Sequence, residues 1–170
     1  MKYSLILIMC SLTAILTAQS ASAQALSGCT RSDQRDPPRV VYRCAGGVTL
    51  EAEAATALGI TESRADGRPT DVEVSSDGLY IQVAPGSGPF QIRTPHAIAA
   101  VRGTVYLVDV SDTRTAVFVR RGEVSVSHAG GSDEVLLTPG LGVDVVPGEP
   151  LETRRWPAAR VQSLMSRFGR

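Results

Sequence analysis

A series of short valine-rich runs between residues 71 and 146, separated by glycine turns, constrains the fold of this chain more than any other feature. Short apolar runs at a spacing of roughly ten residues are typical of β-sandwiches, barrels and β-solenoids. No amphipathic segment long enough for a helical crossover between parallel strands lies among them. The sequence therefore predicts an all-β fold, solenoid-like or sandwich-like. The expected strands are 71–74, 79–84, 90–93, 98–101, 105–110, 116–120, 123–127, 134–137 and 143–146.

Side-chain periodicity indicates which of these strands are buried on two faces. The run Val105–Val108 is apolar at every position, so we expect it in the middle of a sheet. In contrast, Val124 and Val126 alternate with polar residues, which predicts a strand with one wet face. In the run 117–119, Val117 and Val119 should lie on one face of the strand and Phe118 on the other.

The N-terminus has the layout of a secretory signal peptide. Lys2 is followed by an apolar run from Leu5 to Ala18 and then by Ala-Ser-Ala at 21–23. The apolar run is shorter than the roughly 20 residues that cross a bilayer. We therefore predict export, with cleavage after Ala23 (Ala25 is a second acceptable site) and a periplasmic or extracellular location.

Two cysteines, Cys29 and Cys44, remain after cleavage. An even pair in an exported protein predicts a structural disulfide, because the compartment is oxidising and no CxxC spacing or nearby histidine indicates a metal or redox site. The segment between the cysteines is polar and contains Pro37-Pro38, so we expect it to bury little surface.

Beyond the signal peptide at 1–23, composition divides the chain into three parts: a disulfide-bearing N-terminal segment at 24–69, a β domain at 70–147 and a C-terminal helix at 148–170. Within the first part, 48–54 alternates like a strand, while the alanine-rich residues that follow could form a short helix ended by Gly59. We expect a strand followed by a turn.

The C-terminal part predicts an amphipathic helix that opens at Trp156-Pro157, with proline at the first helical position. Its apolar stripe contains Val161, Leu164, Met165 and Phe168, and Arg160 and Arg167 lie opposite. The helix could cap an exposed face or edge of the β structure, or it could dock to a partner or a membrane surface. We favour the capping interpretation, because the stripe is small.

Candidate catalytic and metal-binding residues are few. His96 and His128 occur in no metal-ligand spacing, so we expect surface or turn histidines and no bound metal or cofactor. No serine-nucleophile motif, P-loop or GxGxxG motif occurs. The alternative to a binding protein is a small secreted hydrolase that uses a pair of carboxylates. The candidates for this pair are Glu51, Glu53, Asp109 and Asp144, of which Glu51 and Glu53 are expected on one exposed face.

The formal net charge of zero argues against binding to nucleic acid or to an anionic membrane. The strongest basic clusters are Arg120-Arg121 and Arg154-Arg155. Arginine forks suit carboxylates and phosphates, so Arg120 and Arg121 are candidate partner contacts. Solvated turn arginines, or ion pairs with Asp109, Asp112 and Glu123, are the simpler interpretation.

Four motifs in order resemble the FecR periplasmic domain. They are Phe-Gln-Ile-Arg-Thr-Pro at 90–95, Ala-Val-Arg-Gly-Thr at 100–104, the run 117–126 around Arg-Gly-Glu, and Val-Leu-Leu-Thr-Pro-Gly at 135–140. The similarity extends from Ile81 to Val146. It implies an all-β, solenoid-like periplasmic domain. The structural turn residues of these motifs are Arg102, Gly103, Thr104, Gly122 and Gly140.

In those turns we expect Gly103 and Gly122 to adopt positive φ, and Arg102 to brace the turn by bonding carbonyls or an acidic neighbour. Better-known members of the family sense an occupied outer-membrane transporter and signal to a cytoplasmic sigma factor. This sequence has no cytoplasmic helical domain before its export signal, so we expect only the binding module to carry over.

The sequence therefore predicts an exported, non-catalytic module that binds an envelope protein or a glycan. We expect neither nucleic-acid binding nor stable membrane insertion after signal cleavage. Besides the hydrolase, a further alternative is a structural envelope component that polymerises through exposed edge strands.

Overall fold

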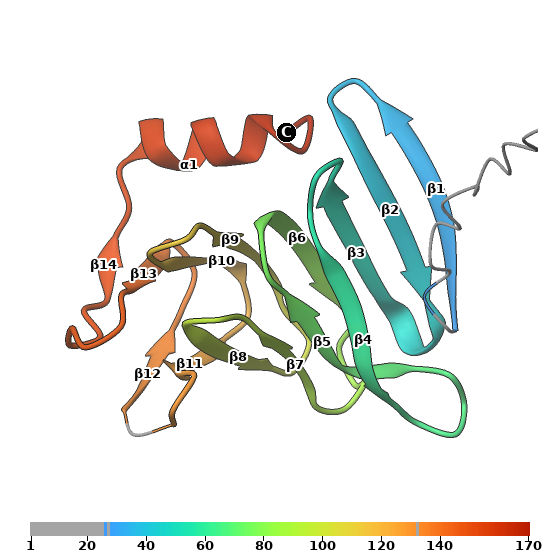
Figure 1. Cartoon of the computed structure of the whole chain (residues 1–170), viewed down its shortest axis with the longest axis horizontal. Coiled ribbons are helices and arrows are strands. Elements are labelled where there is room, and N and C mark those ends of the chain that lie inside the picture. The colour runs from blue at the N-terminus through green and yellow to red at the C-terminus, as the bar shows by residue number, and fades with distance from the viewer. Residues whose placement is uncertain (1–25, 27, 132) are drawn as a thin grey trace, which may run out of the picture.

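The computed structural model describes residue 26, residues 28–131 and residues 133–170. The predicted signal peptide and both cleavage sites lie outside the described residues. Two β-sheets pack face to face, and a single helix lies across the outer face of the larger one (Figure 1). The predicted all-β class, with a disulfide near the N-terminus and a helix at the C-terminus, is confirmed.

The larger sheet has eight strands and the smaller has six. In spatial order the larger contains β1 (Cys29–Arg35), β2 (Pro38–Cys44), β3 (Val48–Glu53), β6 (Asp77–Val83), β9 (Val105–Val110), β10 (Thr115–Arg121), β13 (Leu141–Val145) and β14 (Arg154–Arg155). The smaller contains β12 (Glu134–Leu137), β11 (Val124–His128), β8 (Ala97–Val101), β7 (Phe90–Arg93), β5 (Pro69–Val74) and β4 (Leu58–Ser63).

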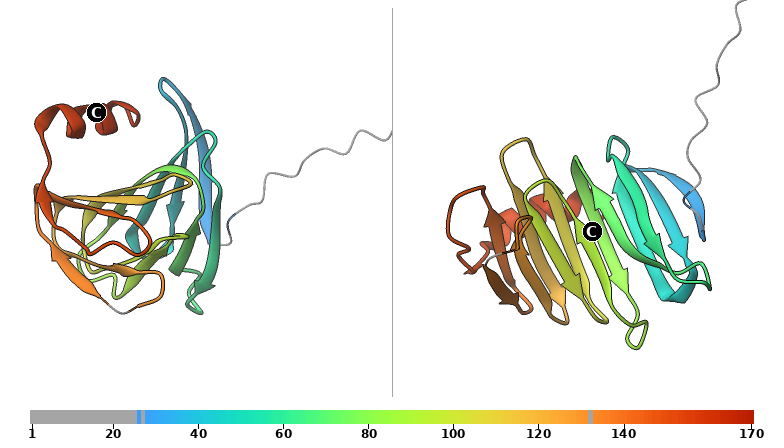
Figure 2. Two further views of the ribbon diagram at one scale, coloured as in Figure 1. Left: turned by 60° about the vertical axis from the view of Figure 1, so that its left-hand side comes forward. Right: turned by 60° about the horizontal axis from the view of Figure 1, so that its bottom comes forward.

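The chain advances along both sheets in sequence order, as the colour gradient in Figure 2 shows. It crosses repeatedly from one sheet to the other, laying down one to three strands before each crossing. Neighbouring strands are antiparallel except β5 and β7. The fold is thus solenoid-like in its path and sandwich-like in its layers, and the segments 24–69 and 70–147 contribute strands to the same two sheets.

The main hydrophobic core lies between the sheets. The larger sheet contributes Leu50, Ile81 and Val117, which pack against side chains such as Ile92 and Val126 of the smaller sheet. Strand β9 is central and buried on both faces, as its uniform apolar sequence predicts. The inward faces therefore follow the two-residue period of the sequence.

All nine strands expected between residues 71 and 146 are present, with ends shifted by at most two residues. Strands β1, β2, β4 and the two-residue β14 were not predicted. Strand β1 is almost wholly exposed and β4 is buried on no more than one face, so neither has the apolar pattern of a core strand. Both lie at sheet edges, where backbone pairing with a single neighbour holds them.

Helix α1 (Ala158–Ser166) covers the outer face of the larger sheet. It begins one residue later than predicted, because Pro157 still has an extended ψ of 143°. Its stripe residues Leu164, Met165 and the following Phe168 form a second hydrophobic core with outward side chains of the sheet. In this core the rings of Phe118 and Trp156 stack with their centroids 5.2 Å apart.

Arginines of the C-terminal segment tie it to carboxylates of the sheet. Arg160 bonds Asp144 at 2.6 and 2.8 Å. Arg167 bonds Glu53 at 2.8 Å and also Asp109 at 2.8 Å, and Arg170 bonds Glu51 at 2.5 Å. The prediction that Arg160 and Arg167 lie opposite the buried face is therefore wrong, because long arginine stems reach around the helix to the sheet.

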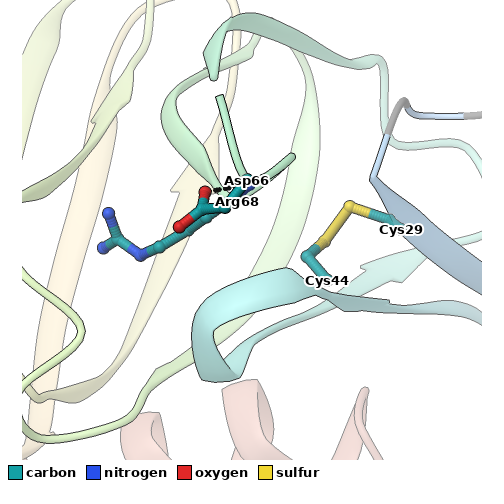
Figure 3. The surroundings of a disulfide bond; sticks show 4 residues. All are labelled: Cys29, Cys44, Asp66 and Arg68. Carbon is teal, nitrogen blue, oxygen red and sulfur yellow. Dashed lines mark hydrogen bonds between the residues drawn. A yellow bond between two sulfur atoms is a disulfide. The ribbon is translucent and has the colours of Figure 1, made fainter. Parts of the chain in front are cut away.

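Cys29 and Cys44 are direct partners across the β1–β2 hairpin and form a disulfide. The bond, shown in Figure 3, closes the open end of this hairpin, since the pairing runs from Cys29 and Cys44 to Arg35 and Pro38 beside the turn. Because β1 is an edge strand with little buried surface, the disulfide adds a covalent restraint to its backbone pairing with β2. Within the described ranges, no helix has the length and apolar character needed to cross a membrane.

Replacing both cysteines by serine is expected to lower the free energy of unfolding by about 3 kcal/mol, the chain-entropy value for a loop of this length. Urea unfolding monitored by circular dichroism measures the change. Dithiothreitol should destabilise the native chain by a similar amount and leave the double variant unaffected. A native chain that keeps its stability in reductant contradicts the structural role of this bond.

Gly142→Ala is expected to displace Trp156, because a Cβ at Gly142 would overlap the indole ring. Overpacking of this kind costs about 1–3 kcal/mol. Trp156 is the only tryptophan of the chain, so its fluorescence reports the change directly as a red shift. Gly130→Ala is the matched control, since a Cβ at Gly130 meets no atom within 4 Å. Unchanged emission from Gly142→Ala would show that the helix is not seated as described.

Candidate functional site

The turns of three of the four family motifs lie together at one end of the sandwich, whereas the Thr94-Pro95 turn of the first motif lies at the other end. Gly103 and Gly122 have φ of +64° and +81°, in the left-handed region that favours glycine. A Cβ at Gly122 would lie 3.0 Å from the carbonyl oxygen of Gly103, so the two turns are in contact. Gly140, with φ of +86°, donates its N–H to the carbonyl of Val119 at 2.9 Å. Motifs far apart in sequence therefore form one surface.

Arg102 and Thr104 occupy opposite environments in the first of these turns. Thr104 is fully buried, and its carbonyl accepts the N–H of Val83 at 2.8 Å. Arg102 is exposed, and its side chain makes no hydrogen bond or ion pair to any described residue. The expected bracing by Arg102 is therefore wrong, and its guanidinium is open to solvent.

Arg120 and Arg121 are exposed at the end of β10, next to these turns. Neither is ion-paired within the part of the chain that the structure describes. Of the carboxylates considered as their partners, Asp109 instead bonds Arg167 at 2.8 Å. Arg155 is also exposed and unpaired there, and its guanidinium lies against Gly140, where a Cβ would be 2.7 Å from Nη1.

Two grooves adjoin this end of the sandwich. One, of about 330 Å³, runs between α1 and β10 and contains Phe118, Val161 and Met165 together with Arg120. The other, of about 570 Å³, lies over the smaller sheet and contains Arg102 beside Leu136. Leu136 is 57% exposed, an unusual exposure for a large apolar side chain in this fold.

Sequence reasoning missed a buried arginine in the same region. Arg68 is 2% exposed, and its Nη2 donates to the carbonyls of Gly88 at 3.2 Å and Pro89 at 3.0 Å. Its Nε and Nη1 have no partner among the described residues, and burial lowers the pKa of its guanidinium. In Figure 3 the guanidinium extends away from the disulfide. The sequence around Arg68 gives no sign of its burial, because the polar residues 64–68 have the composition of a solvent-exposed turn.

The carboxylates considered for hydrolysis are held by arginines of the C-terminal segment. The side chain of Glu51 is only 7% exposed, so its expected position on an exposed face is wrong. Burial raises the pKa of Glu53, but the hydrogen bonds and charge of Arg167 outweigh it and hold the pKa below its ordinary value. Burial likewise raises the pKa of Asp144, but the hydrogen bonds and charges of Arg160 and Arg114 hold this pKa below its ordinary value. A general acid needs a raised pKa, so Glu53 and Asp144 are unsuited to that role.

The histidines do not form a metal centre. His96 lies in the turn between β7 and β8, one of its two expected positions, but it is buried there at 8% exposure, and its Nδ1 lies 3.1 Å from the hydroxyl of Thr115. His128 Nε2 lies 3.0 Å from the carbonyl of Glu149. Both rings border a pocket of about 530 Å³ at the opposite end of the sandwich. Across the described residues, no group of three or more potential ligands is arranged to hold a metal ion.

The fold and the clustered turns define an all-β module built from stacked strand pairs. The sequence profile of the family described as FecR protein matches residues 36–125, which is more than half of the chain. The chain therefore belongs to the FecR family. The match begins well before Ile81, where the motif resemblance started, and it ends before the Thr-Pro-Gly turn at 138–140.

Solved structures agree with this fold. Two crystal structures, at 1.65 and 2.50 Å resolution, of a protein from Parabacteroides distasonis ATCC 8503 provisionally assigned as an anti-sigma factor are similar to this chain, with TM-scores of 0.58 and 0.51. The identity is 23%, and the alignment covers 82% of this chain and 62% of that one. The chain thus spans less than two thirds of the solved protein. No curated protein was found to match.

The ion pairs beneath α1 predict a loss of stability in acid. Because the pKa values of Glu53 and Asp144 are lower in the folded chain than their ordinary values of 4.5 and 3.8, their contribution is complete above those values. It disappears as the pH falls through the lowered values. We expect the urea midpoint to be constant near neutral pH and to fall below pH 4.5.

The double variant Glu53→Gln with Asp144→Asn should show a smaller decrease of the urea midpoint in acid, since the groups that titrate have been removed. Glu62→Gln is the control, because Glu62 is exposed and forms no ion pair with any described residue. An acid decrease of the same size in all three proteins contradicts the assignment.

Proposed function

We propose that this protein is an exported, non-catalytic FecR-type module that binds a protein of the cell envelope. The observation that carries the proposal is the exposed, unpaired set Arg102, Arg120, Arg121 and Arg155, gathered where the family turns meet. Elsewhere most arginines are bonded to carboxylates, as Arg93 is to Asp71 at 2.6 Å. Exposed guanidinium forks without an internal partner are suited to bind groups on another molecule.

The absence of an assembled reaction centre among the described residues agrees with a binding role. The acidic candidates hold the C-terminal helix, and the two histidines are bonded to Thr115 and Glu149. The structural relative is provisionally assigned as an anti-sigma factor, and the family is a regulatory one. We therefore propose a regulatory or signalling role through a protein partner, with a glycan as the less favoured ligand.

The predicted site of action is the periplasm or the extracellular space, after cleavage behind Ala23. The Cys29–Cys44 disulfide supports this location, since such bonds persist in oxidising compartments. In this setting the exposed arginine-bearing end of the sandwich would be accessible to envelope components.

Affinity capture from the native cell envelope tests the proposal, with the chain lacking its predicted signal peptide as bait. We expect a specific protein to be recovered, and its yield to fall about tenfold with Arg120→Ala and Arg121→Ala combined, as two lost charge-assisted contacts imply. Arg35→Ala is the matched control, because Arg35 is also exposed and unpaired within the described residues but lies on edge strand β1. Recovery of no protein, or equal recovery with every bait, contradicts the proposal.

A further inference from the structure

The groove between α1 and β10 combines an apolar floor with unneutralised positive charge. Phe118 of the sheet and Val161 and Met165 of the helix line it, and Arg120 stands at its side. Phe118 and Met165 are buried, so they form a fixed floor. Gln162 lines the same groove from an exposed position on the helix.

The charges around this groove are of one sign. Its lining residues include no aspartate or glutamate within the described chain, while Arg120 and Arg170 both line it. Arg170 is already engaged, because it bonds Glu51 at 2.5 Å and lies 4.1 Å from the centroid of the Tyr80 ring. Arg120 has no such partner among the described residues, and Arg155 approaches the groove at Gly140. The arginine without an ion-pair partner therefore lies at the groove, whereas Arg160 and Arg167 of the helical segment are paired with carboxylates.

We infer that this groove receives an acidic segment of a protein partner, with an apolar side chain on the floor formed by Phe118, Val161 and Met165 and a carboxylate on Arg120. The inference rests on the proposed partner-binding function and specifies the chemistry of the partner. Arginine presents a planar fork that matches a carboxylate in two parallel hydrogen bonds. A buried apolar anchor with polar groups at its rim is the usual arrangement of a protein interface.

A peptide fits the groove better than other polyanions do. Single-stranded nucleic acid is bound on exposed aromatic platforms, and both Phe118 and Trp156 are buried here. An anionic membrane requires a broad exposed apolar face, whereas this floor is recessed between a helix and a strand. A recess of about 330 Å³ flanked by arginine has room for one or two side chains of a peptide.

Fluorescence anisotropy with labelled synthetic peptides tests the inference on the whole chain lacking its signal peptide. The probe is a peptide of alternating aspartate and leucine, compared with a charge-matched peptide of aspartate and serine. We expect the aspartate–leucine peptide to bind at least about tenfold more tightly, the effect of burying one large apolar side chain. Equal affinity for the two peptides, or no binding of the first, overturns the inference.

Two variants separate the charge from the apolar floor. Arg120→Ala with Arg121→Ala removes the charge, and Gln162→Trp fills the groove from an exposed helical position. Each should weaken binding of the aspartate–leucine peptide about tenfold. Arg35→Ala and Ala159→Trp are matched controls, because both residues are exposed and neither lines the groove. Circular dichroism and thermal unfolding establish that all four variants are folded.

Competition identifies the source of the negative charge. Heparin and vesicles of anionic phospholipid should displace the peptide only at low salt, where general electrostatic attraction is strong. Displacement that persists at physiological ionic strength overturns the peptide assignment in favour of a glycan or a membrane. If envelope capture recovers a partner whose yield is unchanged by Gln162→Trp, this inference fails and the proposed function stands; if capture recovers nothing, the proposed function itself fails.

Discussion

The larger sheet is apolar on both faces, and this constraint decides how the rest of the chain is arranged. On its inner face Ile81 and Val117 pack against the smaller sheet, and on its outer face Leu107 and Phe118 need a second cover. Each large apolar side chain gains about 1.5–3 kcal/mol from full burial, so an uncovered outer face would forfeit much of the stability of a small domain. Helix α1 supplies that cover, and its short length suffices because Trp156 and Phe168 extend the contact beyond both ends.

Electrostatics then complete the attachment of the C-terminal segment. The outer face carries acidic side chains around its apolar centre, and Arg160, Arg167 and Arg170 neutralise them. A buried or half-buried carboxylate without a partner would be costly, so helix and sheet depend on each other. The same contacts make Glu53 and Asp144 unsuited to acid catalysis, because they hold the pKa of each carboxyl below its ordinary value. The exposed arginines at the end where the family turns meet, Arg102, Arg120, Arg121 and Arg155, take no part in these contacts and have no ion-pair partner among the described residues.

Much of the β architecture could be predicted from the sequence. The alternation around Val124 and Val126, and the uniform run at 105–108, identify which faces are buried, because strand side chains repeat every two residues. Edge strands β1 and β4 could not be predicted, since backbone pairing holds them and their side chains carry little apolar signal. The burial of Arg68 and His96 also depends on loops that are distant in sequence.

The sequence by itself determined the fold class, the disulfide, the glycine turns and the apolar stripe of the helix, because each depends on local periodicity, spacing or backbone freedom. Only the tertiary structure decided which arginines are neutralised and which are free. Ion pairing joins residues such as Glu53 and Arg167, which are far apart in the chain, and it requires the helix to lie across the sheet in one orientation. The candidate partner groove arises from the same placement, since its floor combines Phe118 of β10 with Val161 and Met165 of α1.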